Sequence, residues 1–537
     1  KSLLGIDQNI VLDTATDAYN NLEIVTSSIY NNGYNITGSL TNQVAMGQEN
    51  GLDTLGVSLP RSTVSLTNDG GNITLSGASS VGMYANYGEL RNMNSGVINV
   101  SGAGSIGMYG ANGTLADNQT GSVINISSSG VGIYAEGNKQ GIAQTFGNGK
   151  IDIVNSGLIQ AGASSNAMGI YANNNSTGIA ADAHVNLSNG TIDLGASENA
   201  VGVFVDKGTV TDSASTITVG KNGVALYAKD STVTLAGTTI NLFGDNSLGL
   251  YLDGTTSFTG SGNININGQN VVLFNMNSSG AISNSFNVVS VAPGSTYTLG
   301  NITGGVFEYT GSSNLASNGT LVYGKGSAIY LNGSAITASP GSTNVAGVVL
   351  DGPYTGFSPL PAGMTSGTDG ENAGIITLGD SSVGIYGKNG SRISNTNTIT
   401  VDNASAGLMT SGAGAFAQNS GTITVGTGSQ GIYLKDGDYA QNTGNILSAG
   451  AGTVGIYANN ASVHVTNGGN IDLSGDKSIG IYSIGTIPQN INNTGALKIG
   501  DSVNTSDPSI GIYGAVAGST ITNSGTVTSG VRSIGMY

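Results

Sequence analysis

The stretch Ser382-Val383-Gly384-Ile385-Tyr386-Gly387 contains a short pattern, here called the anchor, that recurs along most of the 537-residue chain. Its copies, some of them loose, have their aromatic residue at Tyr84, Tyr109, Tyr134, Tyr171, Phe204, Tyr227, Tyr251, Phe274, Tyr386, Tyr433, Tyr457, Tyr482, Tyr513 and Tyr537. A degenerate copy, Gly407-Leu408-Met409, has Met409 in place of the aromatic residue. With this copy included, the positions 386, 409, 433, 457 and 482 are separated by 23, 24, 24 and 25 residues. A fixed period of this length indicates a repeat architecture.

Each repeat also contains an alternating run upstream of the anchor, such as Thr398-Ile399-Thr400-Val401 or Asn470-Ile471-Asp472-Leu473. Strict alternation with β-branched residues predicts a strand with one buried face. Turns with Asn-Ser-Gly or similar sequences precede these runs, at Asn94, Asn155, Asn419, Asn442, Asn493 and Asn523. Asn and Gly tolerate the left-handed conformation that we expect in these turns. One unit therefore reads as strand, turn, strand, turn, strand.

A unit of this size cannot bury its apolar face alone, so neighbouring units must stack. The sequence predicts an all-β fold, a right-handed parallel β-helix (β-solenoid) with about 24 residues per three-strand coil and with loop insertions. Roughly 22 coils at the ~4.8 Å strand spacing would form a rod on the order of 100 Å long. Alternation along the anchor predicts that Val383 and Ile385 face inward, whereas Gly384 and Tyr386 face outward, so that the tyrosines form a ladder.

The composition restricts the functional classes. Hydrophobic residues make up 38% of the chain and recur in phase with the repeat, which argues for a packed interior in spite of 88 glycines and only 9% charged residues. The net charge is −16, and the 15 lysines and arginines are scattered. We therefore expect no nucleic-acid partner and no contact with an anionic membrane surface.

Cysteine is absent, which excludes disulfides and thiolate metal sites. No apolar run approaches the ~20 residues of a membrane helix. The chain starts at Lys1 without a signal sequence and stops at Tyr537 in mid-repeat. We expect a fragment of a longer processed protein whose signal and anchor lie outside this chain.

The repeat predicts four segments. Residues 1–65 lack the anchor and form an N-terminal cap or degenerate coils, with a helical turn conceivable at Asp13–Tyr19. Residues 66–274 and 376–537 form regular β-helix, the second truncated in mid-repeat. Residues 275–375 hold five of the eight prolines and form irregular coils with a protruding loop insertion, because proline cannot donate to a sheet.

Catalytic candidates are few. His184 and His464 occupy matching repeat contexts, as do Asp193 and Asp472, so each is expected to be an outward strand residue on a separate coil. Paired carboxylates ~5–10 Å apart, as glycoside hydrolysis requires, are not evident. We expect no enzyme, no catalytic residue, no metal site and no cofactor. Carboxylates brought together from different coils remain an alternative.

Two features are candidates for binding. The tyrosine ladder is either structural, supporting the stack, or an aromatic stripe for sugars or a partner protein. The loop at 351–364 carries Tyr354 and Phe357 near prolines; it is either packed against the solenoid or exposed for ligand binding. Tyr354 and Phe357 are the predicted ligand-binding residues. Thr-x-Thr pairs, as at Thr398/Thr400 and Thr422/Thr424, are too few for an ice-binding face.

The anchors, alternating with Asn-Ser/Thr-Gly-Thr-Ile-Thr-Val runs, resemble the passenger repeats of giant type V (classical) autotransporter adhesins, in particular the large fusobacterial outer-membrane adhesins. The resemblance covers residues 70–537 except 275–375. It implies secretion through a C-terminal outer-membrane β-barrel outside this chain, a cell-surface location in a Gram-negative bacterium, and a role in virulence. No binding residue is carried over from that family.

The resemblance implies a cell-surface adhesin passenger segment, expected to be monomeric. It would attach to host cells or other bacteria through a glycan or protein receptor, and would contact the membrane only through the absent barrel. Two alternatives remain: a polysaccharide-active β-helix enzyme, and a passive stalk that carries an adhesive tip elsewhere. The irregular 293–364 segment argues against a pure stalk.

Overall fold

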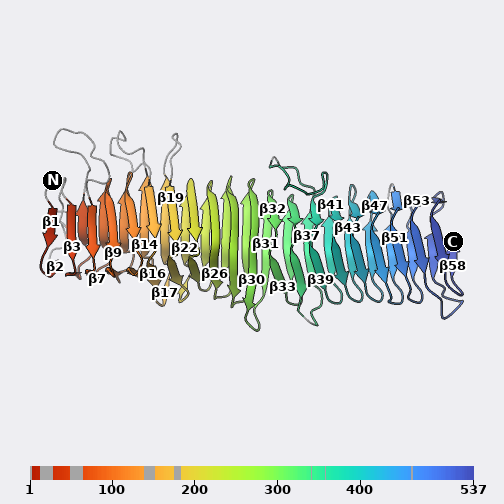
Figure 1. Cartoon of the computed structure of the whole chain (residues 1–537), viewed down its shortest axis with the longest axis horizontal. Coiled ribbons are helices and arrows are strands. Elements are labelled where there is room, and N and C mark those ends of the chain that lie inside the picture. Colours follow the sequence, from red (N-terminus) through yellow and green to blue (C-terminus); the bar gives the residue numbers. More distant parts are fainter. Residues whose placement is uncertain are drawn as a thin grey trace. The chain divides into compact units, whose positions relative to one another are not determined.

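The computed structural model describes residues 3–12, 28–48, 65–137, 151–174, 183–339, 341–356, 358–460 and 464–537. Every regular element in these ranges is a β-strand, and parallel strands stack into a β-solenoid of about 19 turns (Figure 1). The predicted parallel β-helix is confirmed. The expected roughly 22 coils were too many, because insertions such as 352–369 use residues without adding a turn. In the part of the chain that the structure describes, no helix could span a membrane.

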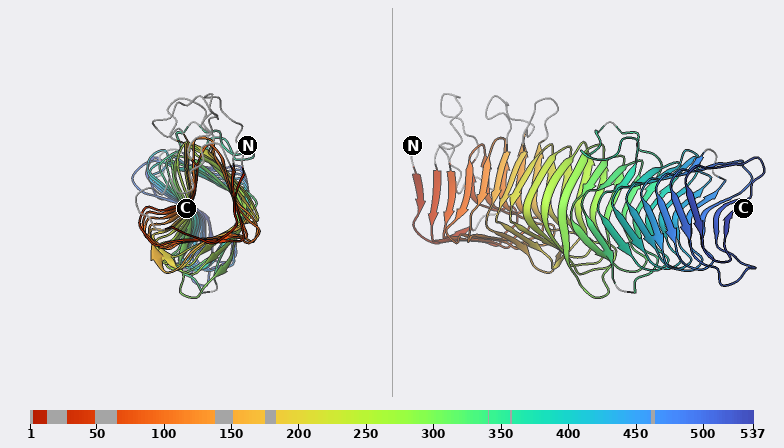
Figure 2. Two further views of the ribbon diagram at one scale, coloured as in Figure 1. Left: turned by 90° about the vertical axis from the view of Figure 1, so that its left-hand side faces the viewer. Right: turned by 45° about the vertical axis from the view of Figure 1, so that its right-hand side comes forward.

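The chain divides into two compact units. The first consists of Lys1–Asn275 and Phe286–Ser295, and the second of Met276–Ser285 and Thr296–Tyr537. Within each unit a coil contributes up to three strands, and each strand pairs with its counterpart in the next coil. We call the three resulting sheets face 1, face 2 and face 3 in chain order, with the anchor on face 3; Figure 2 shows the strands of each face lying over one another.

The first unit begins within the segment predicted as a cap or degenerate coils. Its face 1 strands are β1 (Leu3–Ile6), β3 (Ser28–Asn32), β6 (Ser65–Asp69), β9 (Glu89–Met93), β12 (Leu115–Asn118), β15 (Ile151–Asn155), β19 (Ala183–Ser188) and β23 (Gly208–Ser213). Its face 2 strands are β2 (Ile10–Leu12), β4 (Asn35–Gly38), β7 (Asn72–Leu75), β10 (Val97–Val100), β13 (Val123–Ile126), β16 (Leu158–Ala161), β20 (Thr191–Leu194) and β24 (Thr216–Val219). Its face 3 strands are β5 (Val44–Gln48), β8 (Val81–Asn86), β11 (Ile106–Ala111), β14 (Val131–Gly137), β18 (Met168–Asn174), β22 (Val201–Asp206), β25 (Val224–Lys229) and β27 (Leu248–Gly254).

Strands β26 (Thr232–Leu242) and β28 (Ser257–Ile266) each run through both face 1 and face 2, with an irregularity in register between Leu235 and Thr238. Strands β17 (Ser164–Ser165) and β21 (Ser197–Glu198) form a short separate pair. Strands β29 (Val271–Ser278) and β30 (Ala281–Val291) contribute residues to both units.

The second unit repeats the same three faces. Its face 1 strands are β32 (Val306–Tyr309), β35 (Ala328–Leu331), β38 (Gly370–Asn372), β41 (Arg392–Asn395), β44 (Phe416–Asn419), β47 (Tyr439–Asn442), β50 (His464–Asn467), β53 (Asn490–Asn493) and β56 (Thr520–Asn523). Its face 2 strands are β33 (Ser312–Leu315), β36 (Ala335–Ala338), β39 (Ile375–Leu378), β42 (Thr398–Val401), β45 (Thr422–Val425), β48 (Asn445–Ser448), β51 (Asn470–Leu473), β54 (Ala496–Ile499) and β57 (Thr526–Ser529). Its face 3 strands are β31 (Tyr297–Thr303), β34 (Thr320–Lys325), β37 (Ala346–Asp351), β40 (Val383–Lys388), β43 (Ala406–Ser411), β46 (Gln430–Lys435), β49 (Val454–Asn459), β52 (Ile479–Ile484), β55 (Ile510–Gly514) and β58 (Ile534–Met536).

The described parts of residues 1–65 form strands of coils, since β1 pairs with β3 and β2 pairs with β4 in parallel. The helical turn predicted at 13–19 lies outside the described residues. Whether 1–65 caps the solenoid stays a prediction.

Face 3 corrects the predicted orientation of the anchor. In β49, Ile456 and Ala458 are fully buried and Tyr457 is partly exposed, as expected, but Val454 is partly exposed and Gly455 is buried. Two successive residues point inward because the strand departs from strict alternation at the glycine. A Cβ atom on Gly455 would lie 2.5 Å from the carbonyl oxygen of Gly480 in the next coil. The glycine of the anchor is therefore required by close backbone approach.

A ladder of buried asparagines runs through the turn between face 1 and face 2. Each side-chain amide donates to the side-chain oxygen of the next coil at 2.7–3.0 Å. The buried rungs are Asn31, Asn68, Asn92, Asn118 and Asn155 in the first unit, and Asn372, Asn395, Asn419, Asn442, Asn467 and Asn493 in the second, where the exposed Asn523 is the last acceptor. The left-handed conformation expected for six turn asparagines is confirmed at Asn94, whose φ is 52°. It is wrong for the five that belong to the ladder, which are Asn155, Asn419, Asn442, Asn493 and Asn523. Their role is to satisfy buried backbone and side-chain groups.

The ladder of the first unit stops after Asn155. Val154 pairs with Asn186 in the next coil, so the position that follows Asn155 in the ladder is occupied by Leu187, which has no side-chain oxygen to accept a hydrogen bond. In the coil after that, Asp212 pairs with Leu187. Among the residues that the structure describes, the Nδ2 atom of Asn155 consequently has no hydrogen-bond partner. Burial raises the pKa of Asp212, an effect that hydrogen bonds from Ser215 and Thr238 oppose.

Candidate functional site

The connection between β37 and β38 in the second unit leaves the stack as a long loop, residues 352–369 (Figure 1). It does not project freely. Met364 is buried in a cluster with Val306, Ala328 and Tyr330 of the preceding coils, and Tyr354 and Leu360 pack against that cluster. The Ser358 hydroxyl donates to the carbonyl oxygen of Ser279 at 2.5 Å. The loop therefore folds back over face 1 and covers apolar side chains there.

Asp369, at the end of the loop, fixes its position. Its side chain is fully buried and accepts hydrogen bonds from the backbone N–H groups of Tyr354 (2.9 Å) and Arg392 (2.7 Å). The Arg392 guanidinium lies 3.1 Å from Oδ1 of Asp369, and the Arg392 side chain is 40% exposed. The buried carboxylate is thus paired and hydrogen-bonded, as a buried charge must be.

Beside this loop, face 1 of the second unit carries an open groove of about 380 Å³. Its lining consists of Ser366, Gly367, Thr368, Arg392, Gly414, Phe416, Gln418, Asp438 and Tyr439. The loop supplies one wall through Ser366–Thr368, and strands β41, β44 and β47 supply the floor. Loop and strands therefore build the groove together.

Two aromatic rings form the apolar part of the groove. Phe416 and Tyr439 are in register on adjacent strands, and their rings stack with centroids 5.1 Å apart and planes 4° apart. The His464 ring meets the other side of Tyr439 edge-on, at 6.3 Å. Phe416, Gln418, Asp438 and Tyr439 are all partly exposed. The groove thus combines an aromatic surface with an amide and a carboxylate within one or two coils.

The structure places the predicted binding residues as follows. Tyr354 is partly buried, its hydroxyl donates to the carbonyl oxygen of Ser358 at 2.9 Å, and its ring packs on the apolar cluster under the loop. Phe357 lies outside the described residues. Tyr354 does not line the groove, although its loop does.

The groove residues were missed in the sequence, although a signal was present. Phe416-Ala417-Gln418-Asn419 and Tyr439-Ala440-Gln441-Asn442 are the same pattern one repeat apart, which predicts in-register aromatic residues.

The anchor tyrosines form stacks on face 3 that are partly exposed along most of their length, whereas Tyr84 at the start of the first stack is buried. Ring centroids lie 4.6–5.1 Å apart from Tyr84 to Tyr251 in the first unit and 4.9–5.3 Å apart from Tyr433 to Tyr537 in the second. Burial, and then the Glu136 carboxylate, raise the pKa of Tyr134 above the usual phenol range. Such phenols remain neutral donors at physiological pH. The rings contact one another along the stack, which favours the structural interpretation of the ladder.

The two histidines lie at equivalent positions on face 1. His184 lies in β19 with Nδ1 2.8 Å from the Thr209 hydroxyl, and His464 occupies the equivalent face 1 position in β50. A second open groove in the first unit, of about 480 Å³, is lined by His184 together with Leu115, Asp152, Ile153, Val154, Asn186 and Thr211. This lining offers a single carboxylate.

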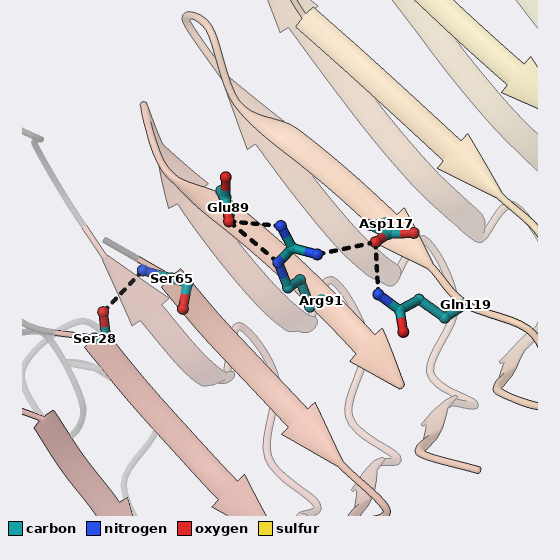
Figure 3. A network of polar contacts seen from close by, with 6 residues as sticks. All are labelled: Ser28, Ser65, Glu89, Arg91, Asp117 and Gln119. Atoms are coloured by element: carbon teal, nitrogen blue, oxygen red, sulfur yellow. Dashed lines mark hydrogen bonds and ion pairs between the residues drawn. The ribbon is translucent and has the colours of Figure 1, made fainter. Parts of the chain in front are cut away.

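Two carboxylates in the first unit share one arginine, and Figure 3 shows their surroundings. Arg91 lies between Glu89 and Asp117, with nitrogen–oxygen distances of 2.9 and 3.3 Å, and Gln119 donates to Asp117 at 2.8 Å. The guanidinium attracts both carboxylates and offsets part of their charge, so this network is suited to linking adjacent strands. Among the described residues no group of His, Asp and Glu side chains could hold a metal ion.

Known proteins provide no family assignment for this arrangement. No protein-family model matches the chain, and no curated protein matches it either.

Proposed function

We propose that this chain is a passenger segment of a cell-surface adhesin, in which the solenoid presents a receptor-binding groove on face 1 of the second unit. Three observations support the proposal: the resemblance of the repeats to autotransporter passengers, the parallel β-solenoid, and the groove beside loop 352–369. The groove carries most of the argument, because exposed aromatic residues next to a loop on a rigid scaffold are a common form of recognition site.

The polysaccharide-active enzyme is the less favoured alternative. Of the described carboxylates near the groove, Asp438 lines it, whereas Asp369 is fully buried against Arg392. Hydrolysis of a glycosidic bond by the usual mechanism needs two carboxylates that reach the substrate. The groove is better suited to holding a ligand than to cleaving it.

The experiment is an adhesion assay with the purified chain labelled with a fluorophore, on host epithelial cells and on partner bacteria. The double variant Phe416→Ala/Tyr439→Ala is compared with Tyr457→Ala/Tyr482→Ala, which removes two stacked rings from face 3 of the same unit. We expect saturable binding by the parent chain, loss of binding in the first variant and retention in the second. Absence of binding by the parent chain would support the stalk alternative and overturn the proposal.

A further inference from the structure

We propose that Tyr109, Tyr134 and Glu136 in the first unit form an oxidative cross-linking site, at which a one-electron oxidant joins two neighbouring coils through a dityrosine bond. The oxidant is of the class of haem peroxidases, which act with hydrogen peroxide. Four features support the inference: the composition of the chain, the contact between the two rings, the carboxylate that they share and the exposure of the site. The inference is independent of the receptor-binding proposal.

The composition directs one-electron oxidation to tyrosine. The chain has 22 tyrosines but no cysteine and no tryptophan, which are the other side chains that lose a single electron readily. Its nine methionines are oxidised differently, by uptake of an oxygen atom to give the sulfoxide. A covalent bond between coils can therefore form through tyrosine, whereas a disulfide is impossible in this chain.

The rings of Tyr109 and Tyr134 are in edge-to-face contact. The two residues pair in register on β11 and β14, with ring centroids 5.0 Å apart and planes that cross at 83°. The carbon–carbon bond of a biaryl lies in the plane of both rings. Only one of two crossed rings must turn to form it, whereas both rings of a parallel stack must turn. Tyr457 and Tyr482 in the second unit form such a stack, with planes 13° apart.

Glu136 lies next to both phenols. The Tyr109 hydroxyl donates to Oε1 of Glu136 and the Tyr134 hydroxyl lies 3.5 Å from Oε2, so one carboxylate holds the two phenol ends close together. Burial, and then the Glu136 carboxylate, raise the pKa of Tyr109 above the usual phenol range, so the neutral phenol meets the oxidant. A phenol that has lost an electron is strongly acidic, and the carboxylate is in position to accept its proton.

The site is accessible to an oxidant, because Tyr109, Tyr134 and Glu136 are all partly exposed. Neighbouring rings extend the contact in both directions. The ring centroid of Tyr84 lies 5.1 Å from that of Tyr109, and the ring centroid of Tyr171 lies 4.6 Å from that of Tyr134. A radical formed on Tyr171 can pass to Tyr134 through this contact, and it is retained where Glu136 accepts the proton.

The coupling is a two-electron oxidation. Each phenol loses one electron and one proton and becomes a tyrosyl radical. The unpaired electron is shared with the ring carbons next to the C–O bond, and one such carbon of Tyr109 bonds to one of Tyr134. Each bonded carbon then loses its hydrogen as a proton and each phenol oxygen regains one, which restores both aromatic rings. Hydrogen peroxide takes up the two electrons and two protons and becomes two molecules of water.

The test treats the purified full chain with a haem peroxidase and hydrogen peroxide, follows dityrosine fluorescence, and locates the bond by mass spectrometry of proteolytic fragments. We expect Tyr109 and Tyr134 to couple within one chain, and faster than Tyr457 and Tyr482. Tyr134→Phe should abolish this cross-link. Glu136→Gln should slow it by about tenfold or more, because the phenols lose their proton acceptor. Glu136→Asp keeps a carboxylate and should restore part of the rate.

Thermal unfolding of each variant separates a proton acceptor from a structural group. Slower coupling in Glu136→Gln with an unchanged melting temperature, and partial recovery in Glu136→Asp, would support proton transfer to the carboxylate. The cross-linked chain should unfold at a higher denaturant concentration than the untreated chain. A bond between residues 25 positions apart restricts the unfolded state, as a disulfide does.

Three results would overturn the inference. Equal coupling of Tyr457 with Tyr482 would show that the crossed rings give no advantage. An unchanged rate in Glu136→Gln would remove the carboxylate from the site. Dityrosine only between separate chains, or none at all, would show that Tyr109 and Tyr134 do not couple.

Discussion

The side-chain amide of Asn419 donates a 2.8 Å hydrogen bond to the side-chain oxygen of Asn442 in the next coil, and both residues are fully buried. The Asn442 amide in turn donates to Asn467 at 2.8 Å and contacts the carbonyl oxygen of Gly444 at 3.2 Å. Each asparagine is thus donor and acceptor at once, so the loss of one rung affects two coils.

Replacing Asn442 by Ala should destabilise the second unit by about 2–3 kcal/mol, because it leaves buried donors and acceptors of neighbouring residues without partners. The measurement is a shift in the midpoint of denaturant unfolding followed by circular dichroism. Asn445→Ala is the matched control: it lies in the same coil with its side chain exposed, and its effect should stay within about 0.5 kcal/mol. Equal effects of the two substitutions would contradict a structural role for the ladder.

The anchor glycine should be intolerant of even one added methyl group. In Gly455→Ala the new Cβ would lie 2.5 Å from the Gly480 carbonyl oxygen and 2.8 Å from Cγ2 of Ile471. Backbone displacement and overpacking should cost about 1–3 kcal/mol. Thermal unfolding compares this variant with Gly162→Ala, where a Cβ meets nothing within 4 Å. A Gly455→Ala protein as stable as its parent would show that the coils can separate to admit a side chain.

Asp212→Asn should stabilise the first unit at neutral pH, and less so in acid. Burial raises the pKa of Asp212 in the folded state above its unfolded value. The folded state therefore binds the proton more tightly. The resulting stabilisation is complete below the unfolded pKa, near 4, and is lost as pH rises through the folded pKa. The asparagine side chain does not titrate, so it contributes no such pH dependence to the stability of the variant.

Unfolding of Asp212→Asn and its parent is measured at pH 4 and pH 7, with the exposed Asp193→Asn as a control in the same unit. The gain in the free energy of unfolding of Asp212→Asn over its parent should be larger at pH 7 than at pH 4. A larger advantage at pH 4 would reverse the sign and refute the burial argument.

Arg392→Met should release loop 352–369 from the stack. The substitution keeps much of the side-chain length but removes the partner of the buried Asp369 carboxylate. We expect faster cleavage within the loop under limited proteolysis, located by mass spectrometry. Lys498→Met, which breaks the exposed 3.2 Å contact with Asp472, should leave the cleavage rate of the loop unchanged. The same rate for Arg392→Met and its parent would show that the apolar contacts of Met364 suffice.

The sequence predicted the solenoid because the same side chains recur once per coil. Ile399 and Ile423, for example, lie one coil apart and pair in register. It also predicted outward tyrosines. It misplaced Val454 and Gly455, because strict alternation was assumed where the close approach of Gly480 makes the strand irregular. Local spacing does not reveal which residues meet across coils.

The groove is a second feature that the spacing of residues in the sequence predicts only in part. The paired aromatic pattern at Phe416 and Tyr439 could have been read from the repeat. The wall formed by Ser366–Thr368 could not, because it depends on how a long loop folds back and on the burial of Asp369 against Arg392. Loop conformations depend on such tertiary contacts and carry little periodic signal.

The in-register pairing of coils also determines how such a chain can acquire its structure. Most paired residues on faces 1 and 2 of the second unit lie one repeat apart, as with the 24 residues between Thr398 and Thr422 or the 23 between Phe416 and Tyr439. The last folded coil presents unpaired backbone N–H and C=O groups with which the next coil can pair. Assembly can therefore proceed one coil at a time, and each step closes a loop of only about one repeat. A polypeptide threaded through a narrow pore could fold on its far side one coil at a time, and each added coil would oppose backward sliding.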